Sequence, residues 1–128
     1  MLENLKLSVH ADRLLSIHKV NLEIDPSAFI MHRSRGWSPE LLGCAAISMR
    51  LITMARPVQG PETYSVFMHE MGHLVSPNQI RPMGLGGAVY LDELDAWRWA
   101  RHNSILWTPT MEAVMVKALG TYSGLKGL

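Results

Sequence analysis

The sequence predicts a single α+β domain, residues 1–128, in which a short β-sheet packs on helices. Capping residues and apolar residues at three- and four-residue steps indicate four helices. Alternation of apolar and polar residues near the middle of the chain indicates strands. The composition is that of a globular protein, with 48% hydrophobic and 18% charged residues. The 128 residues suffice for one modest core, and no repeat or linker divides them.

The first half of the chain has one clear helix and one clear strand region. Residues 8–21 are predicted to be helical, because apolar residues recur on one face and Ser8 can serve as the N-cap. Residues 25–39 show no period, and Arg33–Gly36 within them is typical of a loop. Between Cys44 and Ala55 the apolar residues alternate with polar ones, which predicts one strand or two short strands.

A second helix is predicted to begin at Pro61. Proline at the first helical position and Glu62 in the first turn are typical of a helix start. Apolar residues then follow at helical spacing until Ser76-Pro77-Asn78 terminates the pattern. Residues 76–88 contain two prolines and three glycines, which predicts a loop.

Two further helices are predicted in the last third of the chain. Asp92 is the expected N-cap of the first, with Asp95 three residues later as in a capping box, and this helix should run to about His102. The second begins at Thr108, a capping residue followed by proline, and ends near Gly120. The order of elements is therefore helix, short strands, then three helices, which defines the α+β class.

Charge, cysteine content and hydropathy exclude several classes of protein. The formal net charge of +1 gives no reason to expect binding to nucleic acid or to an anionic membrane. Cys44 is the only cysteine, so no internal disulfide is possible and a reducing cytoplasm is the expected compartment. We expect no signal peptide and no membrane span, because the first residues include several charges and no apolar run is long enough.

The strongest functional signal is an HExxH motif, His69-Glu70-Met71-Gly72-His73, inside the second predicted helix. Two histidines four residues apart lie one turn from each other on the same helical face, so both imidazoles can bind one Zn²⁺. Glu70 lies between them and can act as the general base toward a water molecule that the ion activates. The motif therefore predicts a zinc-dependent hydrolase.

A catalytic zinc site needs a third protein ligand. The chain has Ser76 and Gln79 where an extended HExxHxxGxxH pattern needs glycine and histidine, so that arrangement is excluded. The other common solution is an acid on a following helix, and Glu93 and Asp95 are both available there. His102, at the end of the same helix, is a further candidate.

The motif and the helix that follows it resemble the ImmA/IrrE family of zinc metallopeptidases. That family pairs HE-x-GH with a downstream helix of the form E-x-E-A-x-x-F-A, and this chain offers His69–Leu74 and then Glu93–Ala100. The resemblance covers roughly residues 45–100. It implies a zincin-like fold, zinc ligands His69, His73 and Glu93, and a place for Asp95 beside the ligands or as a helix cap.

The resemblance also implies a function: a small cytoplasmic peptidase that cuts a regulatory protein such as a transcriptional repressor. Glu70 would take the proton of the attacking water and pass it to the leaving amine. Tyr64, Tyr90 and His102 are unranked candidates for the donor that stabilises the oxyanion. The oligomeric state is left open by the sequence.

A second hypothesis is a non-catalytic zinc-binding interaction module on the same fold. It is favoured by Trp97, which stands where the family has a small polar residue that can accept a hydrogen bond from a zinc-bound histidine. Two smaller expectations complete the prediction. His10, His18 and His32 are not expected to be ligands, and Cys44 is expected to be buried as a small apolar residue.

Overall fold

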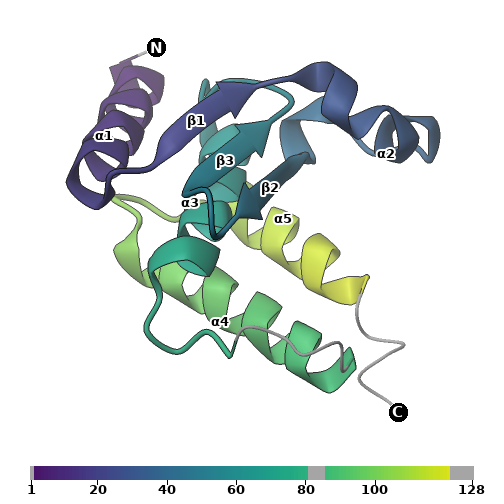
Figure 1. The fold of residues 1–128 in the computed structure, drawn as a ribbon. Helices are drawn as coiled ribbons and strands as arrows, with labels where there is room; N and C mark the ends of the chain where they lie inside the picture. The colour runs from purple at the N-terminus through teal and green to yellow at the C-terminus, as the bar shows by residue number, and fades with distance from the viewer. Residues whose placement is uncertain (1, 81–85, 122–128) are drawn as a thin grey trace.

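The structure, a computed structural model, describes residues 2–80 and 86–121, with the side chains of residues 86–89 left out. It is an α+β arrangement of helices and a three-stranded sheet (Figure 1). The elements in chain order are α1 (Leu2–His18), β1 (Asn21–Ile24), η1 (Pro26–Phe29), α2 (Ile30–Ser34), η2 (Pro39–Leu41), β2 (Gly43–Ala46), β3 (Leu51–Met54), α3 (Pro61–Val75), α4 (Gly86–Asn103) and α5 (Pro109–Gly120). None of the described helices is long and apolar enough to cross a membrane.

The sheet has the order β1-β3-β2. β1 pairs with β3 in parallel, and β2 pairs with β3 in antiparallel register, so that Met54 faces Ile24 on one side and Gly43 on the other. One strand or two short strands were predicted between Cys44 and Ala55, and the structure has two, with β2 beginning one residue earlier, at Gly43. β1 was not predicted, because the expected first helix extended over its first residue.

The first helix starts earlier and ends earlier than predicted. α1 begins at Leu2, and Ser8 lies in its interior instead of capping it. The reason is that Leu7 and Ala11, which are 1% and 2% exposed, bury one face of this helix in the core. Lys19 has a left-handed backbone conformation, with φ of 56°, and this turns the chain into β1.

Residues 25–39, in which the sequence shows no period, contain two short helical elements, and the second includes Arg33 and Ser34 of the predicted loop. The side chain of Asp25 accepts the backbone N–H of Ser27 and caps η1, and α2 follows directly. Phe29 is buried in a small apolar cluster with Leu42 and Ala55, and Trp37 packs against that cluster. This second cluster holds the α2 region against β2 and β3.

The helix that was expected to begin at Asp92 begins at Gly86. Asp92 therefore lies inside α4, and the predicted N-cap and capping box are wrong. The carboxylate of Asp92 accepts a hydrogen bond from the backbone N–H of Ile80, and Asp95 accepts one from Gln79. Both acids bind the segment that precedes the helix, which local sequence rules do not anticipate. Part of the predicted 76–88 loop, residues 81–85, lies outside the described residues.

α3 is the central helix of the molecule. Figure 1 shows it behind the sheet, with α4 and α5 on its other side, and it contacts α1, α4, α5 and the sheet. Its start at Pro61 and its end before Ser76 agree with the prediction. Every residue from Thr63 to Gly72 is buried. Side chains on this helix are therefore held in place by neighbours on all sides.

α3 and α4 are in close backbone contact at Gly72. A Cβ atom added to this glycine would lie 2.6 Å from the carbonyl oxygen of Ala96. No larger residue fits there unless the helices separate. The glycine of the HExxH motif thus determines how close α4 lies to the two histidines.

Candidate metal centre

The contact between α3 and α4 brings three side chains together that could hold a metal ion: His69, His73 and Glu93. Glu93 Oε1 lies 2.9 Å from His69 Nε2, and Glu93 Oε2 lies 2.7 Å from His73 Nε2. The two Nε2 atoms are 3.2 Å apart. The two motif histidines and the acid implied by the family resemblance therefore meet in one cluster.

The spacing and chemistry of this cluster fit a tetrahedral ion. Ligand atoms bound to zinc at 2.0–2.1 Å with tetrahedral angles lie about 3.3 Å from one another. Here the two imidazole nitrogens are 3.2 Å apart, and each has one oxygen of the Glu93 carboxylate nearby, Oε1 at 2.9 Å from His69 and Oε2 at 2.7 Å from His73. Two imidazole nitrogens and one carboxylate oxygen are also a donor set typical of catalytic zinc.

The outer nitrogen of each imidazole faces an oxygen atom. His69 Nδ1 lies 3.1 Å from Glu70 Oε2, and His73 Nδ1 lies 3.0 Å from Gln79 Oε1. Neither a carboxylate nor an amide oxygen can donate, so each Nδ1 must carry the proton. Each Nε2 atom then faces the Glu93 carboxylate either with a lone pair, which the carboxylate repels, or with a second proton. The centre of the cluster therefore requires positive charge, from protons or from a cation.

The pKa values of the cluster express the same requirement. Burial alone would lower the pKa of His69, but the carboxylates of Glu70 and Glu93 raise it to about 9. Burial would also lower the pKa of His73, but its hydrogen bond to Glu93 and the negative charges of Glu70 and Glu93 together raise it. Burial would raise the pKa of Glu93, but hydrogen bonds from the two histidines lower it to about 2. A divalent cation bound here would supply the positive charge that protons supply in its absence.

Trp97 orients His69 by stacking. The indole and the imidazole are nearly parallel, with an interplanar angle of 11° and centroids 4.3 Å apart. The sequence resemblance places a hydrogen-bond acceptor for a histidine at this position, but Trp97 has no acceptor atom. Glu70 Oε2 lies beside His69 Nδ1 and serves as the acceptor instead. Trp97 is 2% exposed, and its Nε1 has no hydrogen-bond partner within the described part of the chain. Packing in the core and against His69 holds this side chain in place.

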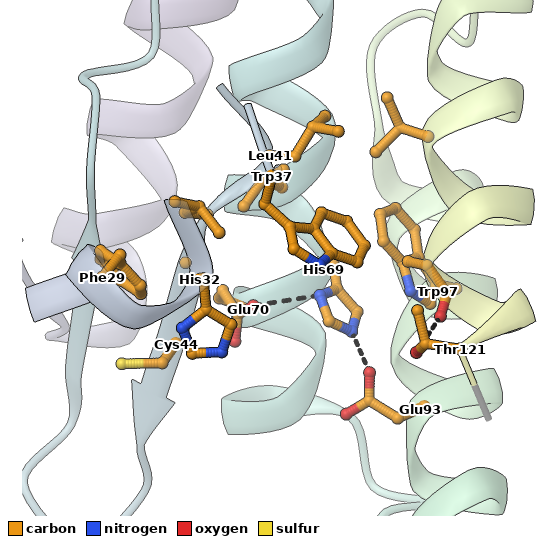
Figure 2. A pocket seen from close by; sticks show the side chains of 15 residues that line it. Phe29, His32, Trp37, Leu41, Cys44, His69, Glu70, Glu93, Trp97 and Thr121 are labelled. Atoms are coloured by element: carbon orange, nitrogen blue, oxygen red, sulfur yellow. Dashed lines mark hydrogen bonds and ion pairs between the residues drawn. The ribbon is translucent and has the colours of Figure 1, made fainter. Parts of the chain in front are cut away.

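Two clefts open beside the cluster, and His69, Glu70 and Glu93 line both. The first, of about 380 Å³, runs between the α2 region and α5 and is shown in Figure 2. Its walls are largely apolar and include Phe29, Trp37, Leu41, Val66, Trp97 and Val114. The second, of about 310 Å³, is bordered by β2 and by the polar side chains of Gln79 and Asp92.

The edge strand β2 lies close to Glu70 because of Gly43. A Cβ atom at this position would lie 2.8 Å from Val66 Cγ1 and 3.6 Å from Glu70 Oε2. The strand therefore passes directly over the face of α3 that carries Glu70. Cys44, the next residue, is exposed and lines both clefts, so the prediction that it is buried is wrong. Cys44 lies on an edge strand that borders both clefts, so open space replaces packed side chains on part of its surroundings.

The other candidate residues lie elsewhere. Asp95 is not part of the cluster and accepts a hydrogen bond of 2.7 Å from Gln79. The Tyr64 hydroxyl is buried and bonded to His10 Nδ1, at 2.8 Å, and to the N–H of Ile105, at 3.0 Å. His102 is exposed near the end of α4.

Within the described residues, none of the three predicted oxyanion donors, Tyr64, Tyr90 and His102, lines either cleft. The sequence analysis considered Gln79 only as the residue that stands where an extended HExxHxxGxxH pattern needs a histidine, and it did not anticipate the contact of Gln79 with His73. It also missed the apolar wall formed by Phe29 and Trp37, because the segment that carries them shows no period.

Compared with known protein families, curated proteins and solved structures, the chain finds no match in any of the three.

Proposed function

We propose that this protein is a zinc-dependent metallopeptidase of the ImmA/IrrE type. The observation that carries the proposal is the cluster of His69, His73 and Glu93, with Glu70 beside it at the meeting point of two clefts. A bound Zn²⁺ would lower the pKa of a water molecule and polarise the carbonyl of the scissile peptide bond. The substrate is a protein or peptide, and the repressor class follows from the sequence resemblance.

Glu70 is the proposed general base. The residue is only 5% exposed, lines both clefts and follows the ligand His69 directly in the sequence. From this position it can accept the proton of the attacking water and deliver it to the nitrogen of the leaving amine. The hydrogen bond from His69 Nδ1 holds one of its oxygens, Oε2, and so limits its rotation.

The first cleft is the proposed site for a side chain of the substrate. Its apolar walls suit a large apolar residue next to the scissile bond. Trp37 forms part of the wall, and the Nζ atom of Lys117 lies 4.9 Å from the centroid of its ring. This cation–π contact joins the wall to α5.

A zincin-like fold is part of the same proposal. It is supported by the helix that carries both histidines, by the acid on the next helix, and by the edge strand β2 beside Glu70. We also consider a non-catalytic metal-binding module. Glu70 is bonded to its own neighbour His69, and Trp97 stacks on the same ring, so these residues could serve only to hold an ion.

One experiment separates the two functions. The zinc-loaded protein is incubated with a library of proteome-derived peptides, and new peptide termini are identified by mass spectrometry. We expect cleavage by the wild type, with large apolar residues enriched on one side of the cut. Glu70→Gln should keep its zinc and lose about 100-fold or more of the activity.

The matched control is Glu62→Gln, since Glu62 is an exposed acid in the first turn of the same helix and should leave the activity unchanged. A zinc-loaded wild type that cleaves no peptide would favour the non-catalytic module. Cleavage that survives Glu70→Gln would contradict the role proposed for Glu70.

A further inference from the structure

We infer that Gln79 is a positioning residue for His73: its side-chain amide holds the ring so that Nε2 is left to bind the ion. The inference rests on the proposed metal site and adds to it a residue that belongs to neither the HExxH motif nor the acidic helix. Three contacts made by one side chain carry it.

The orientation of the Gln79 amide is determined by its neighbours. Its nitrogen, Nε2, lies 2.8 Å from the backbone carbonyl oxygen of Asp92 and 2.7 Å from Asp95 Oδ2. A carbonyl and a carboxylate only accept hydrogen bonds, so the NH₂ group must face them. The amide oxygen then faces His73 Nδ1, at 3.0 Å. A flipped amide would place an oxygen against two other oxygens.

This orientation determines the tautomer of the neutral His73 ring. An amide oxygen has no proton to give, so His73 Nδ1 donates to it. A neutral imidazole with its proton on Nδ1 has its lone pair on Nε2, which is the atom that faces Glu93 and His69. Gln79 therefore holds both the tautomer and the rotation of the ring in the form that binds a cation.

Gln79 is itself anchored to the helix that carries the third ligand. Asp92 and Asp95 flank Glu93 on α4, and both accept hydrogen bonds from the Gln79 side chain. The next residue, Ile80, donates its backbone N–H to the Asp92 carboxylate. The segment after α3 is thus fastened to α4 beside Glu93, and a displacement of either helix is transmitted to His73.

The test compares zinc affinities, measured by competition with a chromophoric chelator. Gln79→Ala should weaken zinc binding by about 10- to 100-fold, the usual effect of removing a hydrogen-bond partner of a ligand. The matched control is Asn78→Ala, because Asn78 is the exposed neighbour of Gln79 and should leave the affinity unchanged. The unfolding midpoint of each metal-free variant is measured in parallel.

A pair of variants separates positioning from a general structural role. Gln79→Glu keeps an oxygen for His73 but places a second carboxylate against Asp95, so binding should weaken. Adding Asp95→Asn removes the repulsion and gives the new carboxylate an amide donor. This double variant should recover much of the affinity lost in Gln79→Glu, because a carboxylate is also a good acceptor for a ligand histidine.

The outcomes distinguish the inference from the proposed function. A wild type that binds no zinc overturns both. A wild type that binds zinc, with the same affinity in Gln79→Ala, overturns only the role of Gln79. A loss of affinity that merely follows a lowered unfolding midpoint, with no recovery in the double variant, also overturns it.

Discussion

The two histidines of the cluster are held in place by opposite means. His69 is buried, stacks on Trp97 and donates to Glu70, so packing and a charged neighbour orient it. His73 is only partly buried and is oriented through the uncharged amide of Gln79. His69 is thus oriented by the proposed catalytic base itself, whereas His73 is oriented by a residue of the segment that follows α3.

The largest effect is expected when a ligand itself is removed. His73→Ala and Glu93→Ala should each weaken zinc binding by more than about 100-fold, since losing a ligand exceeds the effect of losing its hydrogen-bond partner. Elemental analysis after purification with zinc is the measurement. His102→Ala is the control and should retain about one zinc per chain. Zinc retained by Glu93→Ala would contradict the assignment of Glu93 as the third ligand.

The next largest effect is expected at the helix contact that both histidines share. Gly72→Ala places a methyl group against the Ala96 carbonyl oxygen, 2.6 Å away, and must separate α3 from α4. The free energy of unfolding should fall by about 1–3 kcal/mol, as for other overpacked cores, and zinc affinity should fall with it. Urea unfolding measures the first quantity. Gly120→Ala, which meets nothing within 4 Å, is the control.

The pH dependence of zinc binding tests whether His69 must lose a proton before it can bind the ion. Because the pKa of His69 is raised to about 9, a proton competes with zinc at neutral pH. Zinc affinity should therefore increase as the pH rises from 6 to 9, by up to about tenfold per pH unit for each proton released. A flat profile over this range in competition titrations would contradict the raised pKa.

The same pKa values predict the stability of the metal-free protein. A raised histidine pKa stabilises the fold fully below about pH 6.5, and this contribution is lost as the pH rises toward 9. The lowered pKa of Glu93 stabilises the fold above about pH 4.5, and this contribution is lost as the pH falls toward 2. The midpoint temperature of thermal unfolding of the metal-free chain should therefore be highest between these limits, near pH 5–6.

The smallest effect is expected from the stacking on His69. Trp97→Phe retains an aromatic ring against the imidazole, so zinc affinity should stay within about threefold of the wild type. Trp97→Leu removes the stacking and should weaken binding by up to about tenfold, the equivalent of an aromatic pair. Equal affinities in these two variants would show that only the volume of the side chain matters at this position.

The elements that could be predicted from the sequence are those defined by local chemistry. α3 and α5 begin where proline follows a capping position, and their lengths follow from periodicity. β1 could not be predicted, because it has four residues and its partner β3 lies about 30 residues later. The start of α4 was misplaced because Asp92 bonds to Ile80, a contact that a search for N-caps does not consider.

The candidate site divides in the same way. The histidine pair follows from helical spacing, and Glu93 was indicated by the resemblance. The role of Gln79 depends on which way its amide faces, which is set by two oxygens on another helix. The close approach of α4 at Gly72 is equally non-local, because a glycine in the motif does not reveal which atom lies opposite. Both features depend on how α3 and α4 are placed relative to each other, which the local sequence does not reveal.

The position of the ligands along the chain gives the ion a mechanical role. An ion bound by His73 and Glu93 would close a loop of about 20 residues, and a covalent link of that span stabilises a fold by roughly 3 kcal/mol. A chain with a single cysteine has no disulfide of its own to do this. Zinc would then act as a reversible cross-link between two helices, and the stability of the fold would depend on the concentration of free metal.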